Sequence, residues 1–204
     1  MRIVLIDSSL SEDREISSFL IDRMLPFLKG CEYGILHISD PMDERMRRNI
    51  LKAADGIVII TPLSCGGLPS SLSALLSEME MKAMKRNIPV CSVLYGESMA
   101  GQEYVHAENI LKIWKEKCRV HLCMNIRIQG AGTLHFMKNI PVGNGILRKM
   151  NHAFSEMSDA LKGNEKNDVI ITAGSSFLYR KLMESYWKKK LQENGKHRPE
   201  GSDR

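Results

Sequence analysis

The chain has 204 residues, 43% of them hydrophobic and 26% charged, a balance typical of a single globular domain in water. Its apolar runs are about one strand long, whereas a membrane-spanning helix needs roughly 20 apolar residues. The N-terminal run is also too short for the core of a signal peptide. We therefore expect a cytoplasmic protein that makes no membrane contact.

The net charge of +5 is concentrated near the C-terminus. Residues 180–204 hold eight Lys or Arg and four Asp or Glu, a net charge of +4, which leaves +1 for the rest of the chain. No nucleic-acid-binding motif accompanies this tail, so we expect no specific nucleic-acid partner. The five cysteines form no CxxC motif. This spacing argues against a disulfide framework and a zinc site, and we expect no metal.

Apolar runs of two kinds alternate along the chain. The strand-like runs are residues 3–6, 33–38, 56–61, 90–95 and 120–128. Stretches of helical period follow them in turn, at residues 16–28, 42–53, 72–83, 104–114 and 147–161. Five β/α units in strict alternation predict an α/β fold with a five-stranded parallel sheet between two layers of helices. With right-handed crossovers, the simplest arrangement is a flavodoxin-like three-layer sandwich of strand order 2-1-3-4-5.

The composition changes after the fifth helix. We predict a flavodoxin-like domain at residues 1–162, a C-terminal extension at 163–193 and a disordered tail at 194–204. The extension contains a polar linker, a short extended run at 169–172 and a basic amphipathic helix at 178–192. Because it is too small for a core of its own, we expect it to dock on the domain or on a partner subunit.

Three loops meet at the carboxyl edge of the sheet in this fold, those after strands one, three and four. The first opens a helix, whose N-terminus carries unpaired N–H groups and the positive end of the helix dipole. Ser9 and Ser11 add hydroxyl donors there. In the loop after strand three, Pro62 fixes the turn, while Gly66 and Gly67 let bare backbone approach a flat ligand.

Four segments in the same order resemble the NAD(P)H-dependent FMN reductase-type family of the flavodoxin-like superfamily, which is related to the iron–sulfur flavoproteins. The segment ADGIVIITPLSCGGLPSSLSALL at residues 54–76 is similar to the family's third strand and the loop after it. The others are residues 96–114, the glycine-rich IQGAG with PVGNG, and the helix SSFLYRKLMESYWKKKLQENG at 175–195.

The resemblance implies a homodimeric oxidoreductase that passes hydride from NADH or NADPH through FMN to a small-molecule electron acceptor. The phosphate of FMN would lie at the first loop, and its ring between the other two. The flavin supplies the chemistry, so no side chain is expected to be catalytic. The implied cofactor-binding residues are Ser9, Ser11, Thr61, Pro62, Leu63, Ser64, Cys65, Gly66, Tyr95, Gly96 and Glu97.

Departures from the family pattern support an alternative, a flavodoxin-like protein that has lost its flavin and serves as a binding or partner subunit. The family's phosphate loop is of the type GSPRxxGNT, whereas residues 8–16 read SSLSEDREI. A carboxylate about 6 Å from one phosphate charge costs roughly 3 kcal/mol at an effective dielectric constant near 20. Ser64 and Cys65 also replace an aromatic pair. The cysteines that bind the cluster in iron–sulfur relatives are absent, which excludes that cluster.

A third hypothesis is a hydrolase that uses Ser64 or Cys65 as its nucleophile. The chain has no G-x-S-x-G elbow, and no histidine stands at a recognisable spacing from either residue. We expect His106 on a helix surface and His121 at a strand edge. The glycine pairs near residues 130 and 143 lack a third glycine, so they form no dinucleotide-binding fingerprint.

Overall fold

The structure, a computed structural model, describes residues 1–10, 14–63, 67–81, 85–97, 101–137, 145–164 and 166–173, with six further positions between 181 and 192. The strands are β1 (Arg2–Asp7), β2 (Glu32–His37), β3 (Gly56–Pro62), β4 (Pro89–Gly96), β5 (His121–Gln129) and β6 (Val169–Thr172). The α-helices are α1 (Arg14–Met24), α2 (Glu44–Ala53), α3 (Ser70–Met81), α4 (Gln102–Cys118) and α5 (Gly145–Leu161). Two 3-10 helices complete the elements, η2 (Leu25–Leu28) and η3 (Ala131–Met137).

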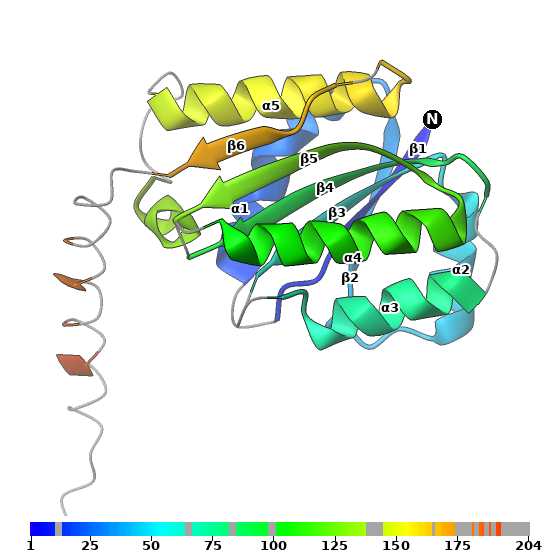
Figure 1. Cartoon of the computed structure of the whole chain (residues 1–204), viewed down its shortest axis with the longest axis horizontal. Coiled ribbons are helices and arrows are strands. Elements are labelled where there is room, and N and C mark those ends of the chain that lie inside the picture. Colours follow the sequence, from blue (N-terminus) through cyan, green and yellow to red (C-terminus); the bar gives the residue numbers. More distant parts are fainter. Residues whose placement is uncertain are drawn as a thin grey trace, which may run out of the picture.

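All strands lie in one parallel sheet of order β2-β1-β3-β4-β5-β6 (Figure 1). The predicted order of the first five strands is confirmed. The predicted number of strands is wrong, because the run at 169–172 pairs beside β5 as a sixth strand. The sequence predicts only a short extended run there, within the C-terminal extension, because four residues give too little pattern to mark a strand of the sheet.

Asp168 attaches the sixth strand to the sheet. Its carboxylate accepts the backbone N–H of Asn125 at 2.7 Å and the side-chain amide of Asn125 at 3.1 and 3.0 Å. Asn125 in turn accepts the hydroxyl of Ser92 in β4 at 2.7 Å. At the other end of β6, the N–H of Ala173 donates to the carbonyl of Gln129. Side-chain and backbone bonds therefore fix both ends of a strand that is too short to pair firmly by itself.

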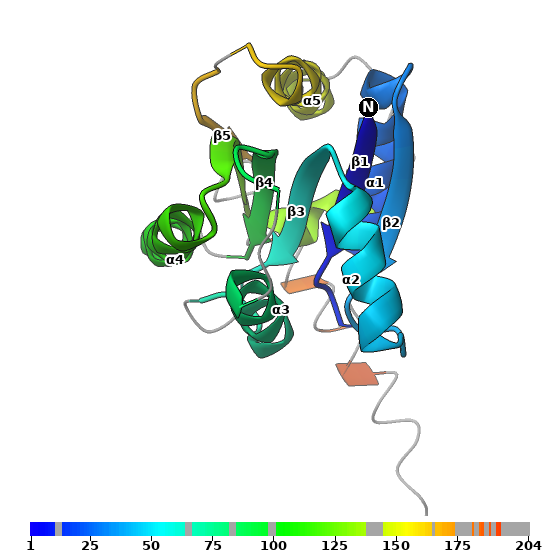
Figure 2. The ribbon, with the colours of Figure 1, turned by 90° about the vertical axis from the view of Figure 1, so that its right-hand side faces the viewer.

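Two apolar clusters fill the space between the sheet and the helices, one on each side. On one side, α1 and α5 cover alternate residues of the strands, such as Leu5 and Val93. On the other side, α2, α3 and α4 cover the intervening residues, such as Val4 and Leu94 (Figure 2). The strands β1, β3 and β4 are buried along nearly their whole length, as expected for a parallel sheet covered on both faces. The predicted three-layer sandwich is confirmed.

No helix in the described ranges is long and apolar enough to span a membrane. The predicted C-terminal helix and tail fall largely outside the described residues. Their docking, the domain boundaries and the cytoplasmic location stay predictions. Both histidines named above lie where expected, with His106 exposed on α4 and His121 exposed at the start of β5.

We predict that Asp168→Ala lowers the free energy of unfolding by about 1–2 kcal/mol, because two amide groups of Asn125 lose a charged acceptor. Urea denaturation followed by circular dichroism measures the change. Asn167→Ala, an exposed neighbour, is the matched control and should change the midpoint little. Equal midpoints for the two variants would contradict the role given to Asp168.

Candidate functional site

The carboxyl ends of β1 and β2 bring an acid and a histidine together. Asp7 and His37 are the last residues of these strands and are direct partners in the parallel register. Asp7 is fully buried, whereas the side chain of His37 is 27% exposed. Parallel neighbours end at the same edge, so their last side chains lie side by side on one face of the sheet.

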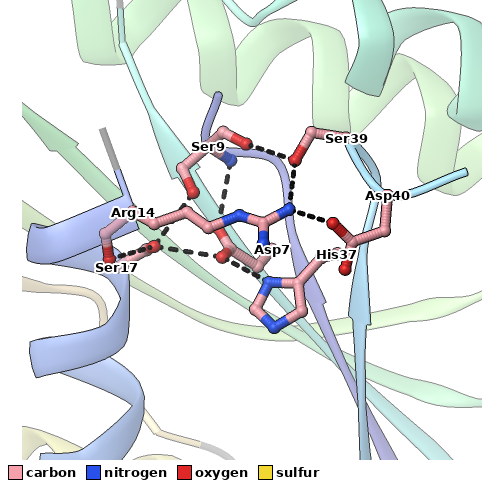
Figure 3. A network of polar contacts seen from close by, with 7 residues as sticks. All are labelled: Asp7, Ser9, Arg14, Ser17, His37, Ser39 and Asp40. Atoms are coloured by element: carbon pink, nitrogen blue, oxygen red, sulfur yellow. Dashed lines mark hydrogen bonds and ion pairs between the residues drawn. The ribbon is translucent and has the colours of Figure 1, made fainter. Parts of the chain in front are cut away.

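The carboxylate of Asp7 accepts three hydrogen bonds from three different parts of the chain (Figure 3). The backbone N–H of Ser9 donates to Oδ1 at 3.0 Å. The hydroxyl of Ser17, in the first turns of α1, donates to Oδ2 at 3.0 Å, and Nδ1 of His37 donates to the same oxygen at 2.8 Å. A carboxylate accepts and does not donate, so the proton of neutral His37 lies on Nδ1. Its Nε2 is then left as an acceptor, on the side of the ring away from Asp7 (Figure 3).

The serine hydroxyls of the first loop are engaged within the protein. Ser9 Oγ lies 2.9 Å from Ser17 Oγ, and because the hydrogen of Ser17 goes to Asp7, Ser9 is the donor. Ser8 donates its hydroxyl to Thr61 Oγ1 in β3 at 2.7 Å and its N–H to the carbonyl of Ile60. Both serines are about 1% exposed, so their donors face protein rather than solvent.

Arg14 at the start of α1 reaches over to the loop after β2. Its guanidinium donates to Ser39 Oγ at 2.8 Å and forms an ion pair with Asp40. The hydrogen bond from Arg14 holds the pKa of the Asp40 carboxyl below its usual value. Ser39 donates to the carbonyl of Ser9, so this contact also fixes the first loop. The positive charge nearest the loop is therefore paired with a carboxylate.

The loops after β3 and β4 begin from one fixed point. Pro62 and Tyr95 are register partners, and the N–H of Leu63 donates to the carbonyl of Tyr95 at 2.7 Å. Gly96 follows, and a Cβ there would lie 3.3 Å from Tyr104 Oη and 3.4 Å from Leu63 Cβ. The buried Tyr104 hydroxyl donates to the carbonyl of Ile128 at 2.7 Å, which connects this point to β5.

Glu97, the next residue, lies across the loop after β5. A Cβ on Gly132 would come within 2.6 and 2.7 Å of the two carboxylate oxygens of Glu97. The absence of a side chain at Gly132 therefore leaves room for this carboxylate. Negative groups thus stand at both ends of the carboxyl edge, Asp7 on the side of β1 and Glu97 on the side of β5.

The described part of the predicted cofactor site is mostly closed to solvent. Ser9, Thr61, Leu63, Tyr95 and Gly96 are buried, while Pro62 is half-buried and Glu97 is exposed. The remaining predicted residues lie outside the described residues; they are Ser11, Ser64, Cys65 and Gly66. The structure brings the described ones together at one edge, as the loop pattern predicts.

Four residues of the edge escaped sequence reasoning, namely Asp7, Ser17, His37 and Ser39. A signal for two of them was present, because the first two predicted strands end near an acid and a histidine. Parallel strands that are neighbours in the order 2-1-3 place such residues together. Ser17 gave no signal, since a serine in a helix is ordinary.

Two open grooves lie elsewhere on the surface, and none of the predicted site residues lines either of them. One, of about 440 Å³, runs beside α2 and includes Arg2 and Asn49. The other, of about 550 Å³, lies between α5 and β6 and includes Arg148 and Ile170. Across the ranges that the structure describes, no group of three or more His, Cys, Asp or Glu side chains is placed to hold a metal ion.

No protein-family model and no curated protein matches the sequence. Solved structures do match the fold. A point mutant of the flavodoxin from Pseudomonas aeruginosa superposes with a TM-score of 0.60 at 15% identity, covering 80% of this chain and 100% of that one. An NADH:FMN oxidoreductase in its apo form gives a TM-score of 0.61 at 14% identity, covering 80% and 91%. The fold is flavodoxin-like.

A further flavodoxin-like match is the general stress protein 14 from Treponema denticola, solved in complex with FMN. It has a TM-score of 0.58 at 9% identity and covers 79% of this chain and 99% of that one. Identities this low establish the flavodoxin-like fold and leave the ligand to be argued from the residues at the edge.

We predict that Ser17→Ala destabilises the protein by about 1–3 kcal/mol, because Asp7 loses a donor in a buried site and Ser9 loses its acceptor. Ser18→Ala, on the exposed side of the same helix, is the matched control and has the same change in helix propensity. Chemical denaturation of both variants measures the difference. A midpoint for Ser17→Ala equal to that of the control would contradict the network.

We also predict that neutral His37 carries its proton on Nδ1, because Asp7 accepts from that nitrogen. Long-range ¹H–¹⁵N correlation spectra distinguish the two tautomers directly. The exposed His106 serves as the reference for an unconstrained imidazole. A neutral His37 that carries its proton on Nε2 alone would show that the hydrogen bond from Nδ1 to Asp7 does not persist in solution.

Proposed function

We propose that this chain binds a flavin at the carboxyl edge of its sheet and acts as an oxidoreductase that takes hydride from NADH or NADPH. The proposal rests on one observation. The loops after β3 and β4 start side by side, because the N–H of Leu63 donates a hydrogen bond to the carbonyl of Tyr95. In a sheet of this topology, ligands bind beyond the carboxyl ends of the strands at the switch point between β1 and β3, and the loops after β3 and β4 lie beside that crevice. A bound flavin would supply the two-electron chemistry itself.

The residues at this point suit a flat ring. Pro62 fixes the backbone where β3 ends, and Gly96 lets the backbone pack closely against Tyr104 and Leu63 at the end of β4. The anchor from Tyr104 to β5 makes the arrangement rigid before any ligand arrives. Such preorganisation lowers the entropy lost on binding.

The described residues of the first loop do not fit a phosphate group. A phosphate needs free donors, whereas the N–H of Ser9 and the hydroxyl of Ser17 already donate to Asp7. Asp7 is itself an anion, and those donors point at its carboxylate. Support for a flavin ligand therefore comes from the ring end of the edge, and none comes from the phosphate end.

The same carboxylate favours a second candidate, a flavodoxin-like subunit that holds no flavin and binds a protein partner. Such a protein would keep the sheet and lose the phosphate donors, which is the combination found in the described part of the first loop. The two candidates differ in a simple observable, since a protein that binds flavin gains its visible absorption band and the partner subunit does not.

We further propose a small-molecule electron acceptor and a homodimer. The dimer is supported by the outer strand β2, whose side chains Tyr33 and Ile35 are 47% and 40% exposed. Exposed apolar residues on an edge strand are a surface that natural proteins usually cover.

We predict that the protein quenches the fluorescence of added flavin and that NADH or NADPH bleaches the visible band of the complex. Gly96→Ala should weaken flavin binding about fivefold or more, since the new methyl group strains the contact with Tyr104 and Leu63 by about 1 kcal/mol or more. Gly34→Ala is the control, because a Cβ there meets nothing within 4 Å. Absence of any flavin band or quenching in the native protein would refute the proposed function and leave the partner-subunit candidate.

A further inference from the structure

We propose that Asp7 makes this site select an unphosphorylated flavin of the riboflavin type over FMN. The inference rests on the flavin-binding function proposed above and adds the chemical class of the ligand's tail. Riboflavin and FMN share the ring and the ribityl chain, and they differ by one phosphate group. A neutral chain of hydroxyls and a charged phosphate make opposite demands on the first loop.

The donors of the first loop converge on the protein's own carboxylate. The N–H of Ser9 is 3.0 Å from Asp7 Oδ1, and the hydroxyl of Ser17 is 3.0 Å from Oδ2. The hydroxyl of Ser9 is directed to Ser17, so this chain of donors also ends at Asp7. With Nδ1 of His37, three donors surround the carboxylate of Asp7, the arrangement with which a protein binds an anionic ligand, and here the anion belongs to the chain.

The charges around Asp7 do not restore a phosphate site. Asp7 is 0% exposed, so solvent screens its charge weakly. Arg14 reaches over this loop, and Asp40 already pairs with it. A phosphate monoester carries about −1.5 to −2 charges near neutral pH and would lie beside the carboxylate of Asp7, whose partners Ser9, Ser17 and neutral His37 carry no charge.

A hydroxyl tail meets the opposite situation. Its O–H groups carry no charge for Asp7 to repel, and the Nε2 of neutral His37, whose side chain is 27% exposed, is an acceptor for them. The hydrogen bond from Nδ1 of His37 to Asp7 fixes the orientation of this acceptor. The loop that rejects a phosphate therefore accepts a polyol.

Fluorescence quenching of riboflavin and of FMN, titrated separately, tests the selection. For the native protein we expect riboflavin to bind roughly tenfold or more tightly than FMN. In Asp7→Asn, which keeps the size of the side chain and removes its charge, FMN should gain roughly 10- to 100-fold while riboflavin changes little. Asp55→Asn is the matched control, an acid at the opposite edge of the sheet that pairs with Lys85.

Equal or tighter binding of FMN by the native protein would overturn the inference and leave flavin binding intact. An unchanged ratio of the two affinities in a folded Asp7→Asn protein would overturn the role of Asp7. If neither flavin binds the native protein, both this inference and the proposed function fail. Should Asp7→Asn not fold, the ratio measured on the native protein decides the question alone.

Discussion

A buried carboxylate at the end of the first strand holds the carboxyl edge of this sheet together. Asp7 accepts hydrogens from Ser9 in its own loop, Ser17 in α1 and His37 in β2. Each hydrogen bond to a charged group contributes about 1.5–3 kcal/mol. Burying one ion costs several kcal/mol, so the terms roughly offset. The contacts therefore fix the positions of the first loop, α1 and β2 more than they add to the free energy of unfolding. Removing a single donor lowers that free energy, because the buried charge then has fewer hydrogen bonds to offset its desolvation.

This carboxylate also sets the chemistry that the edge offers. Without it, the N–H of Ser9 and the hydroxyls of Ser9 and Ser17 would point at an open position and favour an anion. With it, those donors are engaged, and neutral His37 leaves its Nε2 as an acceptor at the end of β2. The other half of the edge depends on backbone, through the hydrogen bond from Leu63 to Tyr95 and the bare backbone of Gly96. In the flavin-binding function that we propose, the two halves would meet different parts of the ligand, its hydroxyl tail and its flat ring.

The sequence predicted the strands well wherever burial on both faces leaves an uninterrupted apolar run, as in β1, β3 and β4. It failed for β6, because an outer strand with one buried residue, Ile171, resembles an ordinary extended segment. The loops at the carboxyl edge were located from glycine, proline and their position after strands. The sequence does not show which hydroxyl donates to which acceptor. In the sequence, Ser9 looks like a free hydrogen-bond donor. Only the pairing of Asp7 with His37 in the sheet and the first turns of α1 show that its donors are engaged.

The fold and the ligand can diverge because they depend on different residues. Stability comes from the two apolar clusters, whose members such as Leu5 and Leu94 lie along the middle of the strands. The residues that would contact a ligand lie beyond these clusters, at the ends of strands and in loops. An acid at such a position costs the core little, provided that nearby donors can satisfy it, as Ser17 and His37 do for Asp7. A sheet can therefore keep its order of strands while its phosphate site changes character, and the ligand has to be argued from the atoms at the edge.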